Sequence, residues 1–550
     1  MAQDDSPRAP FNNWPNDAGF EADVEHRELV ELPVIGSIPS HLAGTLYRTG
    51  PGTYKVADSN YQLSHWFDGF TQLHRFQLVA QPTGSCKVFY SSRWQVDALV
   101  EEARKSGTLK GITFGQKRDP CASIFQKVKG IFLPAFDTKD PKLVNAGVTV
   151  HANAPGMAHH LKDFTLPAGT TRLQSLTSLT DANILKHIDP ETLEPLGVTR
   201  QDSLHPNLKG PLSCAHAEFD AVSGDLYNYN LDLGVYATYR VFRTSATSGK
   251  TDILATITGA AVKPAYLHSF FLSSDYVILC IWPCIFSATG ARILWERNIV
   301  DALKFDSSLQ ARWYVVDRRH DRGIVATYLS PAFFSFHTIN AWQVNNGDDT
   351  TDDIMCDIIQ YPTDERIQRA YYENIVSTSQ GAGKYYDSEA SKPSLVRYRL
   401  SGIPRAGRLK ASARDSDLPG AEMILKINEG VGELPTINPK FSTIKTRYVY
   451  SVIDQGKSSF VDAIAKVDLE TREVRVWGHE RHTPGEAIFV PDGSDETEDA
   501  GYLLSVVLDG DTGRSYLVCL DARDMKEVGR ADCASAIAFG FHGSHYPAQY

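Results

Sequence analysis

Four histidines lie in sequence contexts that favour burial, and together they could bind a metal ion. They are His216, which follows Leu212–Ala215, His268 in AYLHSFF, His337 in FFSFHTI and His542 in FGFHG. A buried imidazole needs a partner for each ring nitrogen, either a hydrogen bond or a metal ion. Any one of them alone is more typical of a core histidine that the backbone satisfies. Their spacings of 52, 69 and 205 residues fit separate structural units that each deliver one histidine to a common axis.

Other common catalytic motifs are absent from the sequence. It contains no HExxH pair, no GxSxG turn and no Gly-rich loop that leads from a strand into a helix and could bind a phosphate. The 55 Lys and Arg residues are outnumbered by 66 Asp and Glu residues, which gives a formal net charge of −11. Proteins that bind nucleic acid over much of their surface are basic, so we expect no nucleic-acid partner.

The elements that would have to position the histidines are short β-strands. Runs rich in Val, Ile, Tyr and Phe alternate with turn residues along most of the chain, for example RYVYS at 447–451 and YLLSVV at 502–507. Three phrases with an Asp-led turn, at 188–194, 467–473 and 520–526, are typical of the outer hairpins of β-propeller blades. No fixed repeat length accompanies them. The residues therefore favour an all-β propeller, with a set of β-sandwiches as the alternative.

The chain is expected to form one large domain with a leader and two insertions. Residues 1–28 are acidic and rich in Pro and Asn, and we expect a flexible leader there, followed by a single propeller domain over 29–550. Amphipathic spacing predicts short helices over 96–105 and 122–132. With neighbouring polar runs, these helices indicate a small helical and loop cap over one face, formed by inserted segments at about 96–136 and 345–392.

No segment of the sequence is expected to cross a membrane or to direct secretion. The longest apolar run, 277–286, is much shorter than the roughly 20 residues of a bilayer-spanning helix. The N-terminal residues lack the apolar core of a signal peptide. The eight cysteines include no CxxC pair, so we expect reduced thiols and a cytoplasmic protein.

The histidine contexts and several further motifs resemble those of the carotenoid cleavage oxygenase family, which consists of non-haem iron enzymes. The resemblance runs from about residue 29 to 547 with the motifs in the same order. Within the family, the sequence looks most like the fungal enzymes that cleave torulene or β-carotene, through FGQKRDPC and HPNLKGPLS. Besides the four histidine contexts, the motifs are GTLYR at 44–48, GPG at 50–52, HWFDG at 65–69, HRF at 74–76, FGQKRDPC at 114–121, DPETL at 189–193 and HPNLKGPLS at 205–213.

The resemblance implies a seven-bladed β-propeller with Fe(II) on its axis. Glu433 in GELP and Glu486 in GEAIFV match two carboxylates that accept a hydrogen bond from the far nitrogen of a ligand imidazole, which fixes its tautomer and raises its basicity. Asp181 stands where the family usually has a third glutamate. Because Asp is one methylene shorter, it would reach its histidine directly, through a bridging water, or after a shift of its strand. The implied iron ligands are His216, His268, His337 and His542.

The resemblance also implies a reaction, the insertion of O2 across one conjugated C=C bond of a carotenoid, which gives aldehyde products without an organic cofactor. We expect a substrate of the torulene or β-carotene type and apocarotenal products. The alternatives are central cleavage of β-carotene to retinal, cleavage of a stilbene, isomerisation of a retinoid ester, and a non-catalytic propeller that binds carotenoids. Thr180 stands where stilbene-cleaving relatives have a lysine that engages the substrate phenol, which argues against a stilbene.

Aromatic and amphipathic segments indicate how a polyene would be bound. Phe336 and the phenylalanines beside the other histidines form either an apolar tunnel, whose aromatic faces stabilise positive charge on the polyene, or core packing around the axis. We include Phe336 and Thr180 among the candidate catalytic residues. Residues 122–136 combine apolar side chains with two lysines. This segment would either dock peripherally on a membrane surface or pack as a helix on the propeller.

Overall fold

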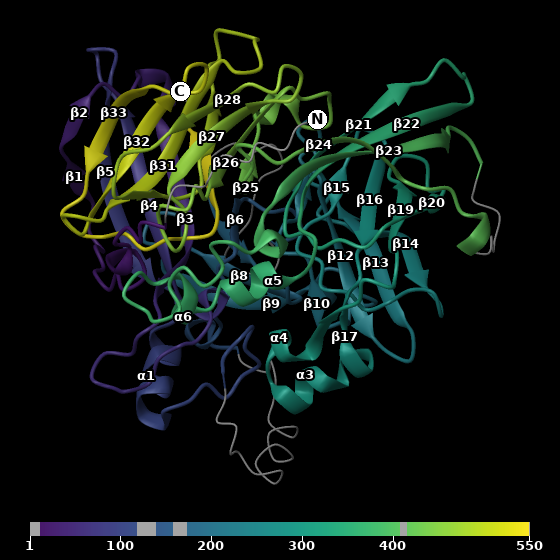
Figure 1. Ribbon diagram of the computed structural model, residues 1–550, viewed down its shortest axis with the longest axis horizontal. Helices are drawn as coiled ribbons and strands as arrows, with labels where there is room; N and C mark the ends of the chain where they lie inside the picture. The colour runs from purple at the N-terminus through teal and green to yellow at the C-terminus, as the bar shows by residue number, and fades with distance from the viewer. Residues whose placement is uncertain (1–10, 118–138, 158–172, 408–414, 549–550) are drawn as a thin grey trace.

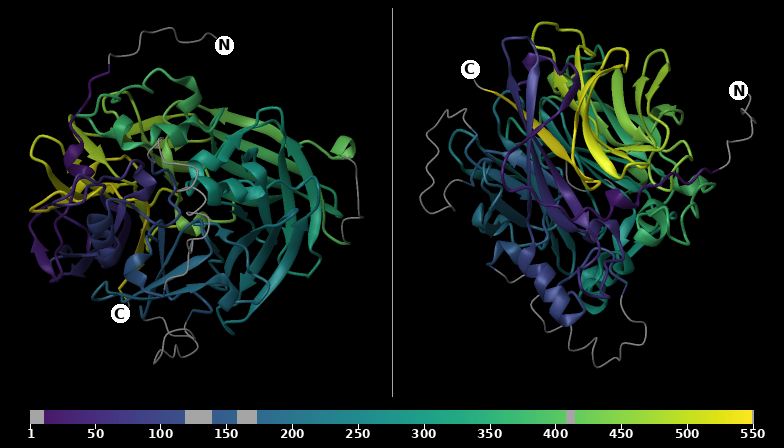
Figure 2. Two further views of the ribbon diagram at one scale, coloured as in Figure 1. Left: turned by 90° about the horizontal axis from the view of Figure 1, so that it is seen from below. Right: turned by 90° about the vertical axis from the view of Figure 1, so that its left-hand side faces the viewer.

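Seven antiparallel β-sheets arranged around one axis make up most of the protein. The computed structural model describes residues 11–117, 139–157, 173–407 and 415–548. Seen from below, the colour runs once around the ring, so successive sheets are neighbours in space (Figure 2). Each of the seven sheets has four to six strands. The predicted seven-bladed, all-β propeller is confirmed, and the β-sandwich alternative is wrong.

Figure 1 labels the strands of the blades. Blade 1 contains β1 (Val30–Leu32), β5 (Cys86–Trp94), β4 (Phe70–Ala80), β3 (Gly44–Thr53) and β34 (Gly543–Pro547); blade 2 contains β6 (Thr149–Ala152), β7 (Leu176–Leu179), β8 (Ile184–Ile188) and β9 (Pro195–Arg200). Blade 3 contains β10 (Leu212–Ser213), β11 (Glu218–Phe219), β12 (Leu226–Leu233), β13 (Ala237–Thr244) and β14 (Thr251–Thr258); blade 4 contains β15 (Phe271–Leu272), β16 (Tyr276–Ile281), β19 (Ala311–Asp317) and β20 (Ile324–Ser330). Blade 5 contains β21 (Thr338–Asn345), β22 (Thr351–Gln360), β23 (Ser394–Pro404) and β24 (Glu422–Ile427); blade 6 contains β25 (Glu433–Thr436), β26 (Tyr448–Ile453), β27 (Ala463–Asp468) and β28 (Val474–Trp477). Blade 7 contains β2 (Val34–Gly36), β33 (Glu527–Asp532), β32 (Arg514–Asp521), β31 (Gly501–Asp509), β29 (His482–Pro484) and β30 (Ile488–Pro491).

Strands from the N-terminal and C-terminal parts of the chain pair to close the ring. β34 runs antiparallel to β3, with Gly543 opposite Arg48. β2 pairs in the same way with β33, with Val34 opposite Ala531. Purple and yellow ribbons therefore lie side by side in Figure 2. Because blades 1 and 7 both depend on these pairings, the ring forms only when segments far apart in sequence have met.

The three Asp-led phrases form hairpin turns, as predicted. In each turn the Asp side chain accepts hydrogen bonds from backbone N–H groups two or three positions later, which satisfies donors that a tight turn leaves unpaired. The turns join β8 to β9, β27 to β28 and β32 to β33. In all three, one non-glycine residue adopts a left-handed conformation; these residues are Leu193, Arg472 and Met525, with φ of 59°, 70° and 62°.

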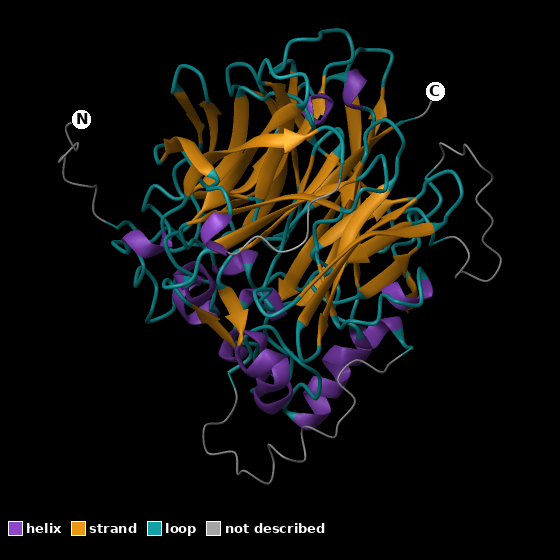
Figure 3. Cartoon of the chain, turned by 90° about the vertical axis from the view of Figure 1, so that its right-hand side faces the viewer, coloured by secondary structure: helices purple, strands orange, loops and turns teal. Residues whose placement is uncertain are grey.

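Short helices gather on one side of the ring and form a cap (Figure 3). Helix α1 confirms the helix predicted over 96–105, whereas the helix predicted over 122–132 lies outside the described residues. A further part of the cap is inserted within blade 4, between β16 and β19, and was not predicted. The cap elements are α1 (Asp97–Ser106), α3 (Ala291–Glu296), α4 (Ile299–Ala302), α5 (Glu365–Arg369), α6 (Tyr372–Ile375), and the two-stranded pair β17 (Cys284–Phe286) and β18 (Leu303–Phe305).

The insertion predicted over 345–392 has different bounds in the structure. Residues 345–360 belong to blade 5, because β21 and β22 pair there with Asn345 opposite Asp352. The polar run that suggested an inserted loop is the turn of this hairpin. The cap segment begins only after β22 and contains α5 and α6.

Residues 11–28 belong to the folded body, which corrects the predicted flexible leader over its described part. Asn16 and Phe20 are 0% and 2% exposed. Asn16 Nδ2 donates to the backbone carbonyl of Ile375 at 2.9 Å and to Ser459 Oγ at 3.1 Å. The polar composition of this segment does not reveal its order, because its partners lie hundreds of residues away in sequence.

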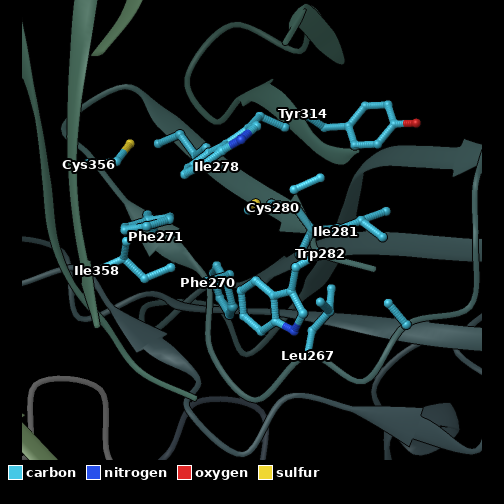
Figure 4. Close-up of a cluster of buried hydrophobic side chains, with 14 of the residues drawn as sticks. Leu267, Phe270, Phe271, Ile278, Cys280, Ile281, Trp282, Tyr314, Cys356 and Ile358 are labelled. Atoms are coloured by element: carbon cyan, nitrogen blue, oxygen red, sulfur yellow. The ribbon is translucent and has the colours of Figure 1, made fainter. Parts of the chain in front are cut away.

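A large apolar core holds the loops that carry two of the histidines. Phe270 and Phe271, directly after His268, pack in the cluster shown in Figure 4. Phe333 and Phe334, shortly before His337, are fully buried in the same core. These four phenylalanines are therefore core packing, which was one of the two interpretations of the aromatic clusters.

Replacing Asn16 with alanine is expected to destabilise the protein by about 2 kcal/mol, because buried backbone and hydroxyl partners lose their hydrogen bonds. Thermal melts at a fixed scan rate measure this change as a lower midpoint temperature. Asn12→Ala is the matched control, since Asn12 is exposed in the same segment. Equal midpoints for the two variants would show that this contact does not hold the segment.

Candidate metal centre

Four imidazoles converge on the axis of the ring. His216 lies in the loop between β10 and β11. The other three histidines, His268, His337 and His542, lie just before β15, β21 and β34, so each of the four belongs to a different blade. Their ligand nitrogens all lie within 4.8 Å of one another. His542 Nε2 is 3.0 Å from His216 Nε2 and 3.3 Å from His337 Nε2. The structure therefore brings together all four histidines that the sequence singles out.

The remaining three blades each supply a carboxylate to these imidazoles. Asp181 follows β7 of blade 2, Glu433 begins β25 of blade 6, and Glu486 lies between β29 and β30 of blade 7. Seven blades thus contribute seven side chains, four imidazoles and three carboxylates. All three carboxylate residues were candidates from the sequence.

Each carboxylate contacts the ring nitrogen that faces away from the cluster. His337 Nδ1 lies 2.6 Å from Glu433 Oε2, and His542 Nδ1 lies 2.7 Å from Glu486 Oε1. His268 Nδ1 lies 3.0 and 2.9 Å from the two oxygens of Asp181. The shorter Asp181 side chain therefore reaches its histidine directly, without a bridging water.

These contacts leave the Nε2 lone pairs pointing at one another. A carboxylate accepts but cannot donate, so the proton of the neutral imidazole is assigned to Nδ1. Burial lowers the pKa of His542 to about 4 despite Glu486, and burial together with the other histidines lowers the pKa of His216 well below its ordinary value. Nitrogen lone pairs that converge in this way are suited to bind a cation between them. This donor set fits a divalent ion of intermediate softness, such as Fe(II).

A third group of donors fixes the carboxylates. Tyr361 Oη donates to Glu433 Oε1 at 2.7 Å, and Tyr266 Oη donates to Asp181 Oδ2 at 2.8 Å. The carboxylate of Glu486 instead accepts from a guanidinium, Arg48 Nη1, at 2.7 Å. Sequence reasoning missed these three residues. The available signal was a lone charged residue, Arg48, within the apolar and Gly-rich strand GTLYRTGPG.

The surroundings keep two of the carboxylates ionised. Burial alone would raise the pKa of Glu433 and Glu486, but their neighbours lower it further, so both pKa values lie below the ordinary value of Glu. The largest opposing contributions come from the partner histidines, and Arg48 adds to them at Glu486.

A cavity of about 270 Å³ with mostly apolar walls opens onto the centre. It reaches His268, His337 and His542, and its wall includes both Thr180 and Phe336. The Phe336 ring lies 5.9 Å from the His268 ring in an edge-on arrangement. Thr180 and Phe336 are thus placed beside the centre, whereas the buried phenylalanines of the core are not part of the wall.

The HWFDG motif shapes one wall of this cavity. The Asp68 carboxylate accepts backbone hydrogen bonds from Phe114 at 2.6 Å and from Gly115 at 2.7 Å. His65 accepts from the backbone N–H of Phe67 and lies 2.9 Å from the carbonyl of Ile367. The motif therefore joins the segment before residue 118 to the cap.

Asp181→Asn is expected to weaken binding of Fe(II) about 10- to 100-fold. The substitution removes the negative charge beside His268, and it places an amide N–H group where the carboxylate accepted hydrogen bonds from Tyr266 and His268. Chelator competition measures the affinity. Asp202→Asn, an exposed position after blade 2, serves as the control. An affinity equal to that of the wild type would show that Asp181 does not support the centre.

Comparison with known proteins agrees with this architecture. A carotenoid dioxygenase of Neurospora crassa is 42% identical over 98% of this chain and 92% of its own length. A torulene dioxygenase of Fusarium fujikuroi is also 42% identical, over 98% and 94%. The solved structure of cobalt-substituted Synechocystis apocarotenoid oxygenase superimposes with a TM-score of 0.73 at 22% identity, over 96% of this chain and 98% of that one. This likeness supports the propeller fold.

The family model described as retinal pigment epithelial membrane protein matches residues 19–547, nearly the whole length of the sequence. The match covers all seven blades and every residue of the centre. The chain belongs to this family, the carotenoid oxygenases.

Proposed function

We propose that the protein is an Fe(II)-dependent dioxygenase that cleaves one conjugated C=C bond of a carotenoid with O2 and releases aldehydes of the apocarotenal type. The observation that carries the proposal is the convergence of four imidazoles, three of which line an apolar cavity. The matched fungal relatives, a carotenoid dioxygenase and a torulene dioxygenase, support a carotenoid substrate.

The residues of the centre have distinct tasks in this proposal. His216, His268, His337 and His542 hold the iron, and the three carboxylates keep three of these imidazoles in the tautomer that offers Nε2. Bound Fe(II) supplies the site at which O2 reacts with the polyene. The cavity wall excludes water from that reaction, and Phe336 presents an aromatic edge and face to positive charge on the polyene.

The cavity favours a hydrocarbon chain over a phenolic substrate. The carboxylates at its wall, Asp68, Asp181 and Glu433, are already engaged by donors of the protein. Thr180 offers a small hydroxyl at the wall, without the positive charge that engages a phenol in stilbene cleavers. We therefore propose a substrate of the torulene or β-carotene type.

We further propose that the cap side rests on a membrane surface from which the carotenoid is taken up. Leu294 and Trp295 of α3 are 41% and 36% exposed, and Val235 and Tyr236 are 89% and 55% exposed. Gly290, directly before α3, packs so closely against Leu233 that a Cβ atom there would lie 2.5 Å from the leucine side chain. The exposed pair on α3 and the exposed pair at 235–236 therefore lie in one region of the surface. Apolar side chains grouped on a surface are typical of interfacial docking. Residues 122–136, predicted to dock, lie outside the described residues, and no described helix is long and apolar enough to span a bilayer.

Wild-type protein is expected to hold about one iron per chain and to form aldehydes from torulene or β-carotene only after air is admitted to an anaerobic mixture. His216→Ala, His268→Ala, His337→Ala and His542→Ala should each abolish turnover and most of the bound iron, because each removes one ligand. Oxygen uptake and product masses are the measurements, and the masses identify the bond that is cut.

Three outcomes would contradict this function. Retention of iron and activity in two of the four variants would overturn the ligand assignment. Product formation without O2 uptake would indicate isomerisation of an ester. A folded wild-type protein without iron would indicate a carotenoid-binding propeller that is not an enzyme.

A double variant, Leu294→Ser with Trp295→Ser, is expected to bind phospholipid vesicles at least about threefold less than the wild type, because it removes apolar area from the docking surface. Co-sedimentation measures the bound fraction. Val476→Ser is the control, since Val476 is 45% exposed on β28, at the opposite end of the molecule from α3 in Figure 1. Equal binding by all three proteins would exclude docking through α3.

A further inference from the structure

Arg48 is a buried cation connected to the metal centre through one carboxylate. Its side chain is only 4% exposed, and Nη1 lies 2.7 Å from Glu486 Oε2. The other oxygen of Glu486 accepts from His542 Nδ1 at 2.7 Å. Guanidinium, carboxylate and imidazole therefore form a continuous chain that ends at the ligand nitrogen.

The fold provides a slot that fits this arginine. Arg48 of β3 lies directly opposite Gly543, the residue after His542, in the pairing that closes the ring. A Cβ atom at Gly543 would come within 2.6 Å of Arg48 Cδ, and one at Gly485 within 3.2 Å of Nη2. Glycines thus flank the side chain on both sides. Burial of a charge is costly unless the charge is paired, and this slot places the guanidinium directly against the carboxylate of Glu486.

The three carboxylates are not held in the same way. Tyr361 and Tyr266 hold Glu433 and Asp181 with neutral hydroxyl groups, whereas Glu486 is held by a positive charge. A hydroxyl would satisfy the same oxygen of Glu486 without the cost of burying a cation. The difference therefore concerns charge rather than hydrogen bonding.

The charges of this hydrogen-bonded network match a divalent ion. Three carboxylates and one guanidinium give a net charge of −2 around four imidazoles, which are neutral when they bind a metal ion, and a doubly charged ion neutralises this charge. A triply charged ion would leave one positive charge uncompensated in a buried site. Arg366 also lines the cavity and its charge helps to lower the pKa of Glu433, but among the described residues no hydrogen bond joins it to this network.

We propose that Arg48 sets the charge of the centre so that iron stays divalent in air. The inference rests on the proposed iron site and adds a task for one residue outside it. The unwanted reaction is the transfer of one electron from Fe(II) to O2, which leaves Fe(III) and superoxide. Without the guanidinium the network carries −3, which stabilises Fe(III) and makes this transfer more favourable.

The test uses iron-loaded protein without substrate and measures two quantities. The first is the Fe(III)/Fe(II) potential, and the second is the lifetime of Fe(II) in air, which is followed by the growth of the ferric electron paramagnetic resonance signal. Arg48→Gln keeps a donor to Glu486 but removes the charge, and we expect a lower potential and about tenfold faster oxidation. Arg48→Lys keeps the charge and should stay close to the wild type. Arg318→Gln is the control for loss of a buried arginine, because Arg318 is 1% exposed and pairs with Asp220 away from the centre.

Opposite substitutions separate charge from structural damage. Glu486→Gln makes the network less negative and is expected to raise the potential, and the double variant Arg48→Gln with Glu486→Gln should return toward the wild type. Structural damage would shift both single variants in the same direction, and that result would overturn the proposal. If Arg48→Gln does not fold, the sign of the shift in Glu486→Gln still decides. Absence of iron from the wild type would instead refute the proposed function.

Discussion

Lone pairs directed at one point repel, and a cation bound among the four imidazole nitrogens removes that repulsion. This interaction organises the whole molecule. Four blades place a histidine at the axis, and the other three place the carboxylates that keep three of those histidines in the right tautomer. A ring of seven sheets is well suited to the task, because each blade supplies one side chain to the axis. The cleavage chemistry proposed for this family member depends on that convergence.

Apolar packing supports two of the loops that carry the histidines, in addition to the polar contacts of the site. Phe270 and Phe271 anchor the loop of His268, and Phe333 and Phe334 anchor the loop of His337. Phe336 and Phe541 instead face the cavity. One aromatic-rich sequence context thus serves two purposes, and the direction of each side chain from its loop decides which purpose it serves.

The pattern of strands and turns predicted the propeller and the apolar contexts indicated the four histidines, whereas the three carboxylate positions followed from the family resemblance. The sequence was not sufficient for Tyr266, Tyr361 and Arg48, because their tasks arise from contacts across blades. Arg48 and Glu486, for example, are 438 positions apart. The segment at 11–28 looked disordered for a related reason, as its polar residues find their partners near 375 and 459. Polar runs were also misleading at 345–353, where a hairpin turn resembled an inserted loop.

The joint that closes the ring has a consequence for how the protein keeps its iron. His542 and Arg48 lie on the two neighbouring segments that meet there, and the backbone N–H of Thr49 donates to the carbonyl of His542 at 2.9 Å. A fluctuation that separates β3 from β34 therefore withdraws an imidazole and breaks the guanidinium–carboxylate pair in one movement. Bound iron would therefore link segments from the two ends of the chain, because a ligand that binds only the closed ring stabilises it.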